Sequence, residues 1–310
     1  MDAADTVETL PAARPGRRRS RLGERAIELA LAACGYASVV VLGGIFLLLL
    51  WQGAKAFREI PLLEFLTSIR WDPTSPEQAR YGILSMVAST ALVTVGAMAI
   101  TVPLGLGVAA YLAEFAHPRV REVVKPAVEM LAGIPSVVVG FVGIVVLGPW
   151  LAEVFGLPNG LNALNGSILL AVMALPTAVS LSEDAFRSVP RDYRQASLAL
   201  GASPWETLVR VTLPAAAPGI TAAMMLAMGR VIGETMTVLM ACGNAPAFPG
   251  GFLSPVRTMT ATIAIELGEV PHGTAHYFAL FAVGFALFCL SFAVNWVADR
   301  VLRRYRGGRG

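Results

Sequence analysis

Long apolar stretches dominate this chain, and polar segments that often contain proline separate them. Five stretches approach or exceed the ~20 residues that an α-helix needs to cross ~30 Å of hydrocarbon. They are Ile27–Trp51, Ile83–Leu112, Ala127–Trp150, Ala215–Ala241 and Tyr277–Ala298. A shorter sixth stretch, Ser167–Leu181, also predicts a span, because bilayer adjustment or burial among neighbouring helices accommodates a short helix. We therefore predict an all-α integral membrane protein with six transmembrane helices.

Composition supports the membrane class. Of 310 residues, 55% are hydrophobic and only 15% are charged, which lies outside the usual range of soluble proteins. The first apolar stretch is longer than the roughly 7–15 residues of a cleaved signal peptide, and no small-residue cleavage site follows it. We expect this stretch to remain as a membrane anchor.

The distribution of basic residues predicts the orientation. Segments on one side of the predicted spans carry 18 Lys and Arg residues, against five on the other side. The positive-inside rule then places both termini and the loop 183–214 in the cytoplasm. The resulting order is a basic tail at 1–25, a first transmembrane helix at 26–51, an outer-face loop with a short helix at 52–80, a membrane core at 81–299 and a basic tail at 300–310. Orientation and anionic lipid explain the net charge of +3, so we expect the lipid bilayer and no nucleic acid as a partner.

Catalytic and metal-binding patterns are missing from the sequence. The three cysteines, Cys34, Cys242 and Cys289, form no CxxC pair, and the three histidines lie in separate segments. Neither of the two lysines follows a GxxxxG loop, so the chain has no Walker A motif for ATP. We expect no catalytic residues, no metal and no cofactor in this chain, and another polypeptide must bind any ATP.

Two charged residues, Arg230 and Glu234, lie within the fifth apolar stretch. Each charge at that depth costs about 2.5–3.5 kcal/mol on insertion scales, so we expect both to face the bundle interior or a water-filled path. Spacings of three and four place small and polar residues on one helical face. These residues are Ala223, Ala227, Arg230, Glu234, Thr237 and Ala241. Gly229 and Gly233 beside this face would let another backbone approach.

This pair has two interpretations. Arg230 and Glu234 could simply neutralise each other between helices, but such i,i+4 pairs contribute only ~0.2–0.5 kcal/mol on exposed helices and this order is the less favourable one. We favour a transport path, because a guanidinium group gives two parallel hydrogen bonds to a tetrahedral oxyanion. Glu234 would then position Arg230 and keep the empty site from binding the anion too tightly, with Thr237 on the same face.

Proline and glycine interrupt three spans. Pro103 and Pro176 favour simple kinks. Gly133-Ile-Pro135-Ser136 instead predicts a half-helix that restarts there and directs free N–H groups and its positive dipole end toward an anion. Ser136 would add a hydroxyl donor.

The segment Gln195–Pro214 predicts a polar helix-turn-helix between apolar spans, a pattern suited to contact with a soluble partner. It resembles the EAA loop of ABC importer permeases, whose short coupling helix docks on the ATPase subunit. Gln195, Ser197 and Val211 depart from the usual Glu, Ala and Ile. The resemblance implies ATPase-coupling roles for Gln195, Ala196, Ser197, Gly201, Leu213 and Pro214.

Together with GRVIGETMTVLMACGN and TMTATIAIELGE, this loop makes the chain similar to the PstC-type permease family of bacterial phosphate-specific ABC importers. The resemblance implies the type I ABC importer permease fold and alternating-access import of phosphate across the bacterial cytoplasmic membrane. It implies as partners a homologous second permease subunit, dimeric nucleotide-binding ATPase subunits and an extracytoplasmic phosphate-binding protein.

Three alternatives remain open on the sequence alone. The substrate could be sulfate, molybdate or another oxyanion on the same architecture. An ion-coupled secondary carrier would use Arg230 and Glu234 as a relay without ATP, although the EAA-like loop argues against it. A membrane scaffold for phosphate signalling would carry no transport of its own.

Overall fold

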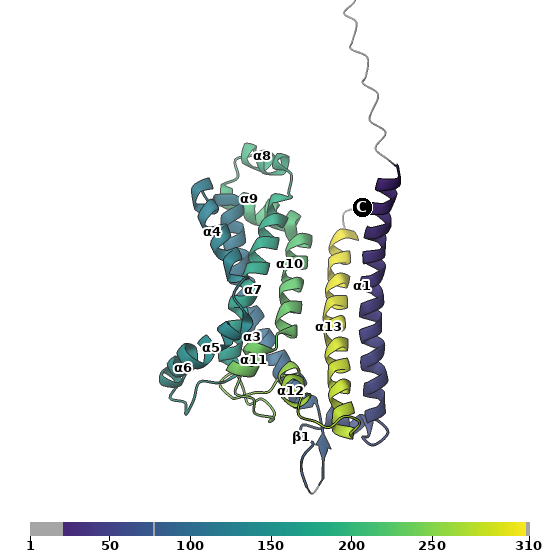
Figure 1. Ribbon diagram of the computed structural model, residues 1–310. Helices are drawn as coiled ribbons and strands as arrows, with labels where there is room; N and C mark the ends of the chain where they lie inside the picture. Colours follow the sequence, from purple (N-terminus) through teal and green to yellow (C-terminus); the bar gives the residue numbers. More distant parts are fainter. Residues whose placement is uncertain (1–20, 77, 308–310) are drawn as a thin grey trace, which may run out of the picture. The chain divides into compact units, whose positions relative to one another are not determined.

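The computed structural model describes residues 21–76 and 78–307, and α-helices account for most of them (Figure 1). The chain forms two compact units. The first unit ends at Leu48, and the second begins at Leu49. The first unit consists, within the described residues, of the first part of the long helix α1. The second unit holds the remaining elements. Most of the predicted tail 1–25 and the last residues of the tail 300–310 lie outside the described residues.

Helices of very different length follow one another along the described residues, with a small hairpin near the start. In chain order the elements are α1 (Arg21–Ala56), α2 (Leu62–Thr67), β1 (Trp71–Asp72), β2 (Arg80–Tyr81), α3 (Leu84–Ala110), α4 (Pro118–Leu131), α5 (Ser136–Val142), α6 (Gly148–Phe155), α7 (Ala163–Arg187), α8 (Arg191–Ala199), α9 (Pro204–Thr207), α10 (Leu213–Gly233), α11 (Met236–Ala241), α12 (Met259–Glu266) and α13 (Ala275–Gly307). Short π-helical turns extend three of the spans: η1 (Tyr111–Phe115) continues α3, η2 (Gly143–Leu147) joins α5 to α6, and η3 (Leu208–Thr212) joins α9 to α10.

Six helical segments of the described chain are long and apolar enough to cross a membrane, as the sequence predicts. They are Arg25–Ala56, Leu84–Phe115, Ser136–Phe155, Ala163–Arg187, Pro204–Gly233 and Ala275–Val297. The prediction for the third span was wrong at its start, because residues 127–131 belong to the amphipathic helix α4 and the chain breaks at Ala132–Pro135. The prediction for the fifth was wrong at its end, because its helix stops at Gly233.

Helices α3, α7 and α10 pack against one another and form the centre of the second unit (Figure 1). Alanines fill the contact, including the fully buried Ala97, Ala174 and Ala227. Such small side chains allow the close helix packing that is typical of membrane bundles. Both α3 and α7 continue as helices through Pro103 and Pro176, so neither proline ends its span.

A second core cluster joins α2, the β1–β2 hairpin, α12 and the start of α13. The sequence predicted the short helix in this loop but not the hairpin, in which Trp71 pairs with Tyr81. Trp71 is buried, and its ring meets the Tyr81 ring edge-on at 5.9 Å between centroids. Burial raises the pKa of Tyr81 above its ordinary value, and the carboxylate of Glu59 raises it further. The phenol therefore stays neutral across the physiological pH range.

Candidate functional site

A break between α10 and α11 forms the centre of the candidate site. Helix α10 ends at Gly233, Glu234 adopts an extended conformation with φ −70° and ψ 134°, and α11 begins at Met236. The Oγ1 of Thr260 donates to the carbonyl oxygen of Glu234 at 2.9 Å. This bond satisfies one of the carbonyl groups that the broken helix leaves without an intrahelical partner.

A second helix begins beside this break. Helix α5 starts at Ser136, after the bend that Gly133 and Pro135 produce, and α5 packs against α11. Thr237 Oγ1 donates to the carbonyl oxygen of Ser136 at 3.2 Å and also lies 3.1 Å from Met173 Sδ. The half-helix that the sequence predicts at Ser136 is therefore present, and two of the predicted pathway residues, Ser136 and Thr237, are in contact.

The packing of α5 against α11 is close enough to exclude larger side chains. A Cβ atom on Gly140 would lie 2.9 Å from Met240 Sδ and 3.4 Å from the carbonyl oxygen of Met236. Thr237 is completely buried and Ser136 is partly exposed. The two helix breaks are thus held together by side-chain packing as well as by the threonine bond.

Arg230 and Glu234 do not share one continuous helix, which corrects the sequence-based prediction of a single face. Arg230 lies in the last turn of α10 and is exposed, whereas Ala223 and Ala227 on the preceding turns are buried. Within the described residues, Arg230 forms no ion pair with Glu234 and no hydrogen bond to another group. The arginine side chain is therefore available to a ligand or to a partner.

The predicted close approach at Gly229 and Gly233 does not occur within the described chain. A Cβ atom added at either glycine would meet no atom within 4 Å. This end of α10 instead presents Arg230 on an open surface, in a span where an unpaired charge facing lipid is costly. The surface is thus suited to contact with a second membrane subunit or with water.

The predicted helix-turn-helix of the coupling loop is present as α8, a turn at Gly201 and α9. Gly201 has φ +87°, a backbone conformation that favours glycine. Ser203 and Glu206 form a capping box at the start of α9. Across the turn, Ser197 Oγ and Thr207 Oγ1 lie 2.9 Å apart and join the two helices.

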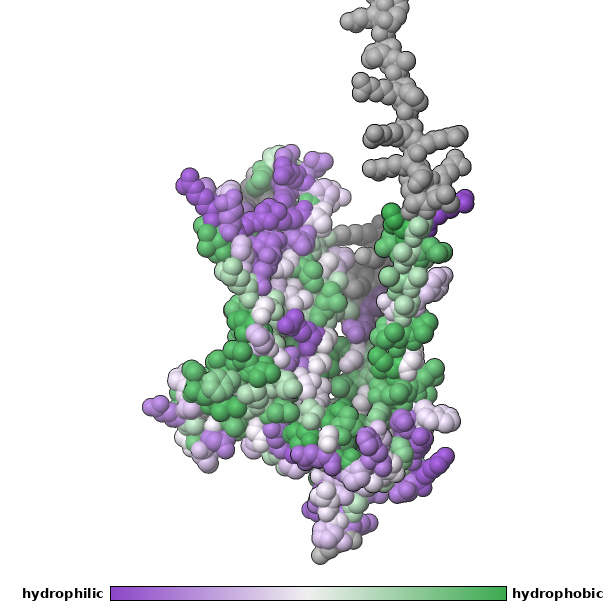
Figure 2. Space-filling model, viewed as in Figure 1, coloured by the Kyte–Doolittle hydropathy of each residue, from purple (hydrophilic) through white to green (hydrophobic). Residues whose placement is uncertain are grey.

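An open groove of about 570 Å³ lies along this loop. Its lining includes the predicted residues Ala196, Ser197 and Gly201. Gln195 and Pro214 are exposed and Leu213 is partly buried near the start of α10. Figure 2 shows hydrophilic side chains gathered over α4, α8 and α9 at this end of the second unit.

Large apolar residues of the coupling loop are exposed among these polar side chains, and they were not predicted from the sequence. Leu200 is 90% exposed and Trp205 is 65% exposed. Exposed apolar side chains of this size within a polar rim are suited to contact with another protein. The signal in the sequence is an apolar residue on each side of Gly201 within a polar loop.

Arg194 connects the coupling loop to the membrane helices. One of its η nitrogens lies 2.7 Å from Glu114 Oε1 at the end of the α3 span and donates to the carbonyl oxygen of Phe186 in α7 at 2.7 Å. Side-chain exposure is 20% for Arg194 and 13% for Glu114. Arg194 therefore joins α8 to the end of the α3 span and to α7.

Comparison with known families identifies the class of protein to which this chain belongs. The family described as binding-protein-dependent transport system inner membrane component matches residues 101–307, more than half of the chain. The chain belongs to this family. It is therefore a permease subunit of an ABC transporter and a multi-pass protein of the bacterial inner membrane.

Relatives match nearly the whole permease. The probable ABC transporter permease protein YqgH of Bacillus subtilis is 34% identical, over 89% of this chain and 90% of its own length. The phosphate transport system permease protein PstC of Mesorhizobium japonicum is 33% identical over 96% of both chains. PstC 2 of Mycobacterium tuberculosis is 33% identical over 92% of this chain and 93% of its own.

Solved structures show the same fold. An inward-facing MetNI methionine ABC transporter matches with a TM-score of 0.57 at 19% identity, covering 72% of this permease and 95% of that chain. A bacterial ABC transporter that imports alginate matches with a TM-score of 0.61 at 15% identity, covering 92% and 99%. The predicted type I ABC importer permease fold is thereby confirmed.

Proposed function

We propose that this permease imports inorganic phosphate into the cytoplasm by alternating access. The observation that carries the proposal is the exposed, unpaired Arg230 at the end of a membrane-spanning helix. A guanidinium group facing lipid is costly, so Arg230 must meet water or another subunit. Its planar donors suit the oxygens of a tetrahedral anion. The PstC names of the relatives support phosphate as that anion.

In this proposal, Arg230 binds the passing anion and Ser136 offers donors at the start of α5. The first N–H groups of a helix have no intrahelical acceptor and carry partial positive charge, which favours an anion. The negative charge of Glu234 lowers the affinity of the site for the anion. The hydrogen bond from Thr237 to Ser136 holds α11 against α5. Arg230 lies on an open surface, so we place the path between this chain and a homologous second permease.

We further propose that ATP hydrolysis takes place in dimeric nucleotide-binding subunits docked on the coupling loop. Gln195, Ala196, Ser197 and Gly201 belong to the docking surface, and Leu213 with Pro214 begins the helix that leads to Arg230. Closure of the ATPase dimer would pull α8 inward, and Arg194 would carry this motion to α3 and α7. The loop then lies in the cytoplasm, together with both termini, and an extracytoplasmic phosphate-binding protein docks on the opposite face.

Uptake of labelled phosphate by the assembled complex in proteoliposomes tests the proposal. We expect unlabelled phosphate to compete, and sulfate and molybdate to leave uptake unchanged. Competition by sulfate or molybdate instead would assign the permease to another oxyanion. Uptake driven by an ion gradient without ATP would refute the ABC mechanism.

The variant Arg230→Gln should lower phosphate uptake by at least about 100-fold, because a neutral amide cannot replace a charge-assisted bidentate contact worth about 3 kcal/mol. Complex assembly should remain normal, since Arg230 forms no hydrogen bond and no ion pair within the described chain. Arg25→Gln, which removes an exposed arginine at the start of α1, is the matched control and should transport at the normal rate. Unchanged uptake by Arg230→Gln would refute the role of Arg230 in the path.

A further inference from the structure

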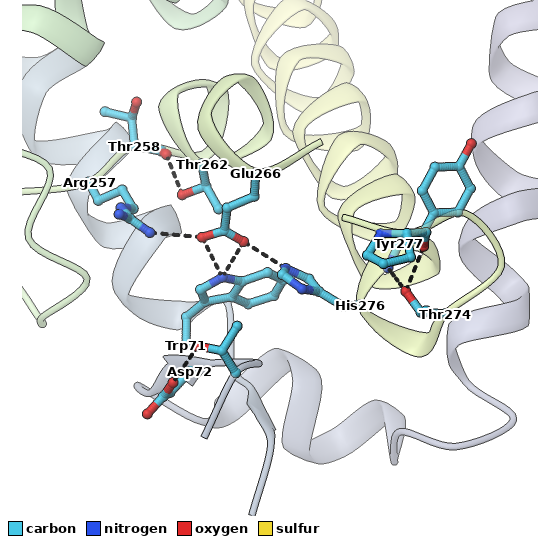
Figure 3. Close-up of polar contacts among 11 residues, drawn as sticks. Trp71, Asp72, Arg257, Thr258, Thr262, Glu266, Thr274, His276 and Tyr277 are labelled. Atoms are coloured by element: carbon cyan, nitrogen blue, oxygen red, sulfur yellow. Dashed lines mark hydrogen bonds and ion pairs between the residues drawn. The ribbon is translucent and has the colours of Figure 1, made fainter. Parts of the chain in front are cut away.

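Three side chains meet at Glu266, at the end of the second unit opposite the coupling loop (Figures 1 and 3). Arg257 donates to Oε1 at 2.8 Å, and His276 Nε2 lies 2.8 Å from Oε2. The indole N–H of Trp71 points between the two oxygens, at 3.1 and 3.0 Å. The side chains of Arg257, Glu266 and His276 are 18%, 15% and 14% exposed, so one nearly buried carboxylate organises the whole cluster.

These contacts connect elements that are far apart in the sequence. Trp71 belongs to the β1–β2 hairpin, Glu266 is the last residue of α12, and His276 lies in the first turn of α13. Arg257 also donates through Nε to the carbonyl oxygen of Asn244, beyond the end of α11, at 3.1 Å. The carboxylate of Glu266 therefore joins the hairpin, α12 and α13, and Arg257 extends the connection to α11.

Stabilisation of α12 itself does not explain these charges. Arg257 precedes Thr258, which caps the start of α12, and Glu266 ends the helix. A cation near the positive N-terminus and an anion near the negative C-terminus both oppose the helix dipole. The ion pair between Arg257 and Glu266 therefore stabilises the junction of the hairpin, α12 and α13, although it destabilises α12 itself.

The opposite end of α12 holds the candidate site. Thr260 lies in its first turn and donates to the carbonyl oxygen of Glu234, at the break after Arg230. Thr258 Oγ1 lies 3.1 Å from Thr260 Oγ1 and fixes that hydroxyl. Glu266 follows Thr260 by six positions along the helix, which is a rise of about 9 Å. Helix α12 is thus a short rigid link between the Glu266 cluster and the break.

We propose that Glu266 and Thr260 are positioning residues that transmit the docking of the binding protein to the helix break at Glu234. The docking surface consists of the hairpin and of the exposed turn 267–274 between α12 and α13. A protein that binds to this surface displaces Trp71 or His276. Because both side chains contact the carboxylate of Glu266, α12 moves with them. The carbonyl group of Glu234, which Thr260 of α12 holds, then moves as well. This inference rests on the proposed function and on the proposed orientation, with the coupling loop in the cytoplasm.

The test compares basal ATPase activity with ATPase activity stimulated by phosphate-loaded binding protein, in the complete reconstituted complex. Glu266→Gln removes the charge that holds Arg257, and Thr260→Val removes the hydroxyl that holds Glu234 at nearly constant volume. We expect each variant to lower the ratio of stimulated to basal activity about tenfold, with normal assembly and basal activity. The double variant should be no worse than either single variant, because both act on one link.

Glu153→Gln is the matched control, since Glu153 is an exposed carboxylate on α6, outside the proposed docking surface, and should keep the wild-type ratio. A wild-type ratio in Glu266→Gln or in Thr260→Val would overturn the inference. A parallel fall of basal and stimulated activity would also overturn it, because the residues would then be merely structural. If the wild-type complex imports another oxyanion, the proposed function fails, while the ratio measured with that anion's binding protein still decides this inference.

Discussion

The buried carboxylate of Glu183 illustrates how single residues hold together the half of this permease that bears the coupling loop. Glu183 lies in α7 with 0% side-chain exposure, and Arg121 and Lys125 of α4 approach it at 2.8 and 3.0 Å. Arg187 adds a contact at 3.6 Å one turn later on α7. An unpaired charge at this depth would be strongly unfavourable, so the two cations from α4 are required for α4 to pack on α7.

We expect Glu183→Gln to lower the free energy of unfolding by about 2–4 kcal/mol, because it leaves the cations of α4 without a buried partner. Arg121 and Lys125 are 26% and 27% exposed and can still reach water, which keeps the loss from being larger. Thermal unfolding of the purified permease in detergent measures the change. Asp184→Asn, at a neighbouring carboxylate that is 64% exposed, is the control and should change stability by less than about 1 kcal/mol. Equal effects of the two variants would contradict the prediction.

At the scale of elements, interrupted helices distinguish this permease from a simple bundle. The breaks at 132–135 and at 234–235 lie next to each other because α5 packs against α11. The backbone N–H and C=O groups at helix ends within a membrane need hydrogen-bond partners from protein or water. Here the hydroxyl of Thr260 is such a partner for the carbonyl oxygen of Glu234. In the proposed mechanism, the same elements provide polar groups for the anion and joints at which the helices reorient.

The turn between α8 and α9 gives a prediction at this scale. Gly201→Ala should weaken retention of the ATPase subunits about 5- to 30-fold, because a left-handed conformation costs a non-glycine residue about 1–2 kcal/mol. A Cβ atom at Gly201 meets no atom within 4 Å, so the effect comes from the backbone alone. Copurification of the ATPase with the tagged permease measures it.

Gly107→Ala serves as the control for this change, since a Cβ atom there also meets no atom within 4 Å and Gly107 lies inside α3. Alanine favours a helix over glycine, so this variant should assemble normally. Full ATPase retention in Gly201→Ala would show that docking does not depend on the shape of this turn.

At the scale of the whole molecule, the asymmetry of 18 against five basic residues predicts the orientation in the membrane. Single cysteines at Thr74 and His272 should react with an impermeant maleimide from outside intact spheroplasts. A cysteine at His117 should react only after permeabilisation. The native residues Cys34, Cys242 and Cys289 are replaced by alanine beforehand. The opposite labelling pattern would reverse the orientation and would place the coupling loop outside the cell, away from ATP.

Sequence alone determined the membrane class, the number of spans and the coupling helix-turn-helix. These properties depend on local chemistry: a span needs about 20 apolar residues, and the turn needs a glycine such as Gly201 with φ +87°. The family followed from the spacing of a few motifs. The half-helix at Ser136 was also predictable, since Gly133 and Pro135 cannot continue a helix.

Only the tertiary structure decided which residues meet. Periodicity extended the fifth helix through Glu234, whereas the packing of α11 on α5 and the hydroxyl of Thr260 stabilise a break there. The carboxylate of Glu266 finds Trp71 at a separation of 195 residues, which no local pattern encodes. The physical reason is that a buried polar group must find its partners in space, and in a membrane bundle those partners come from helices that the sequence keeps far apart.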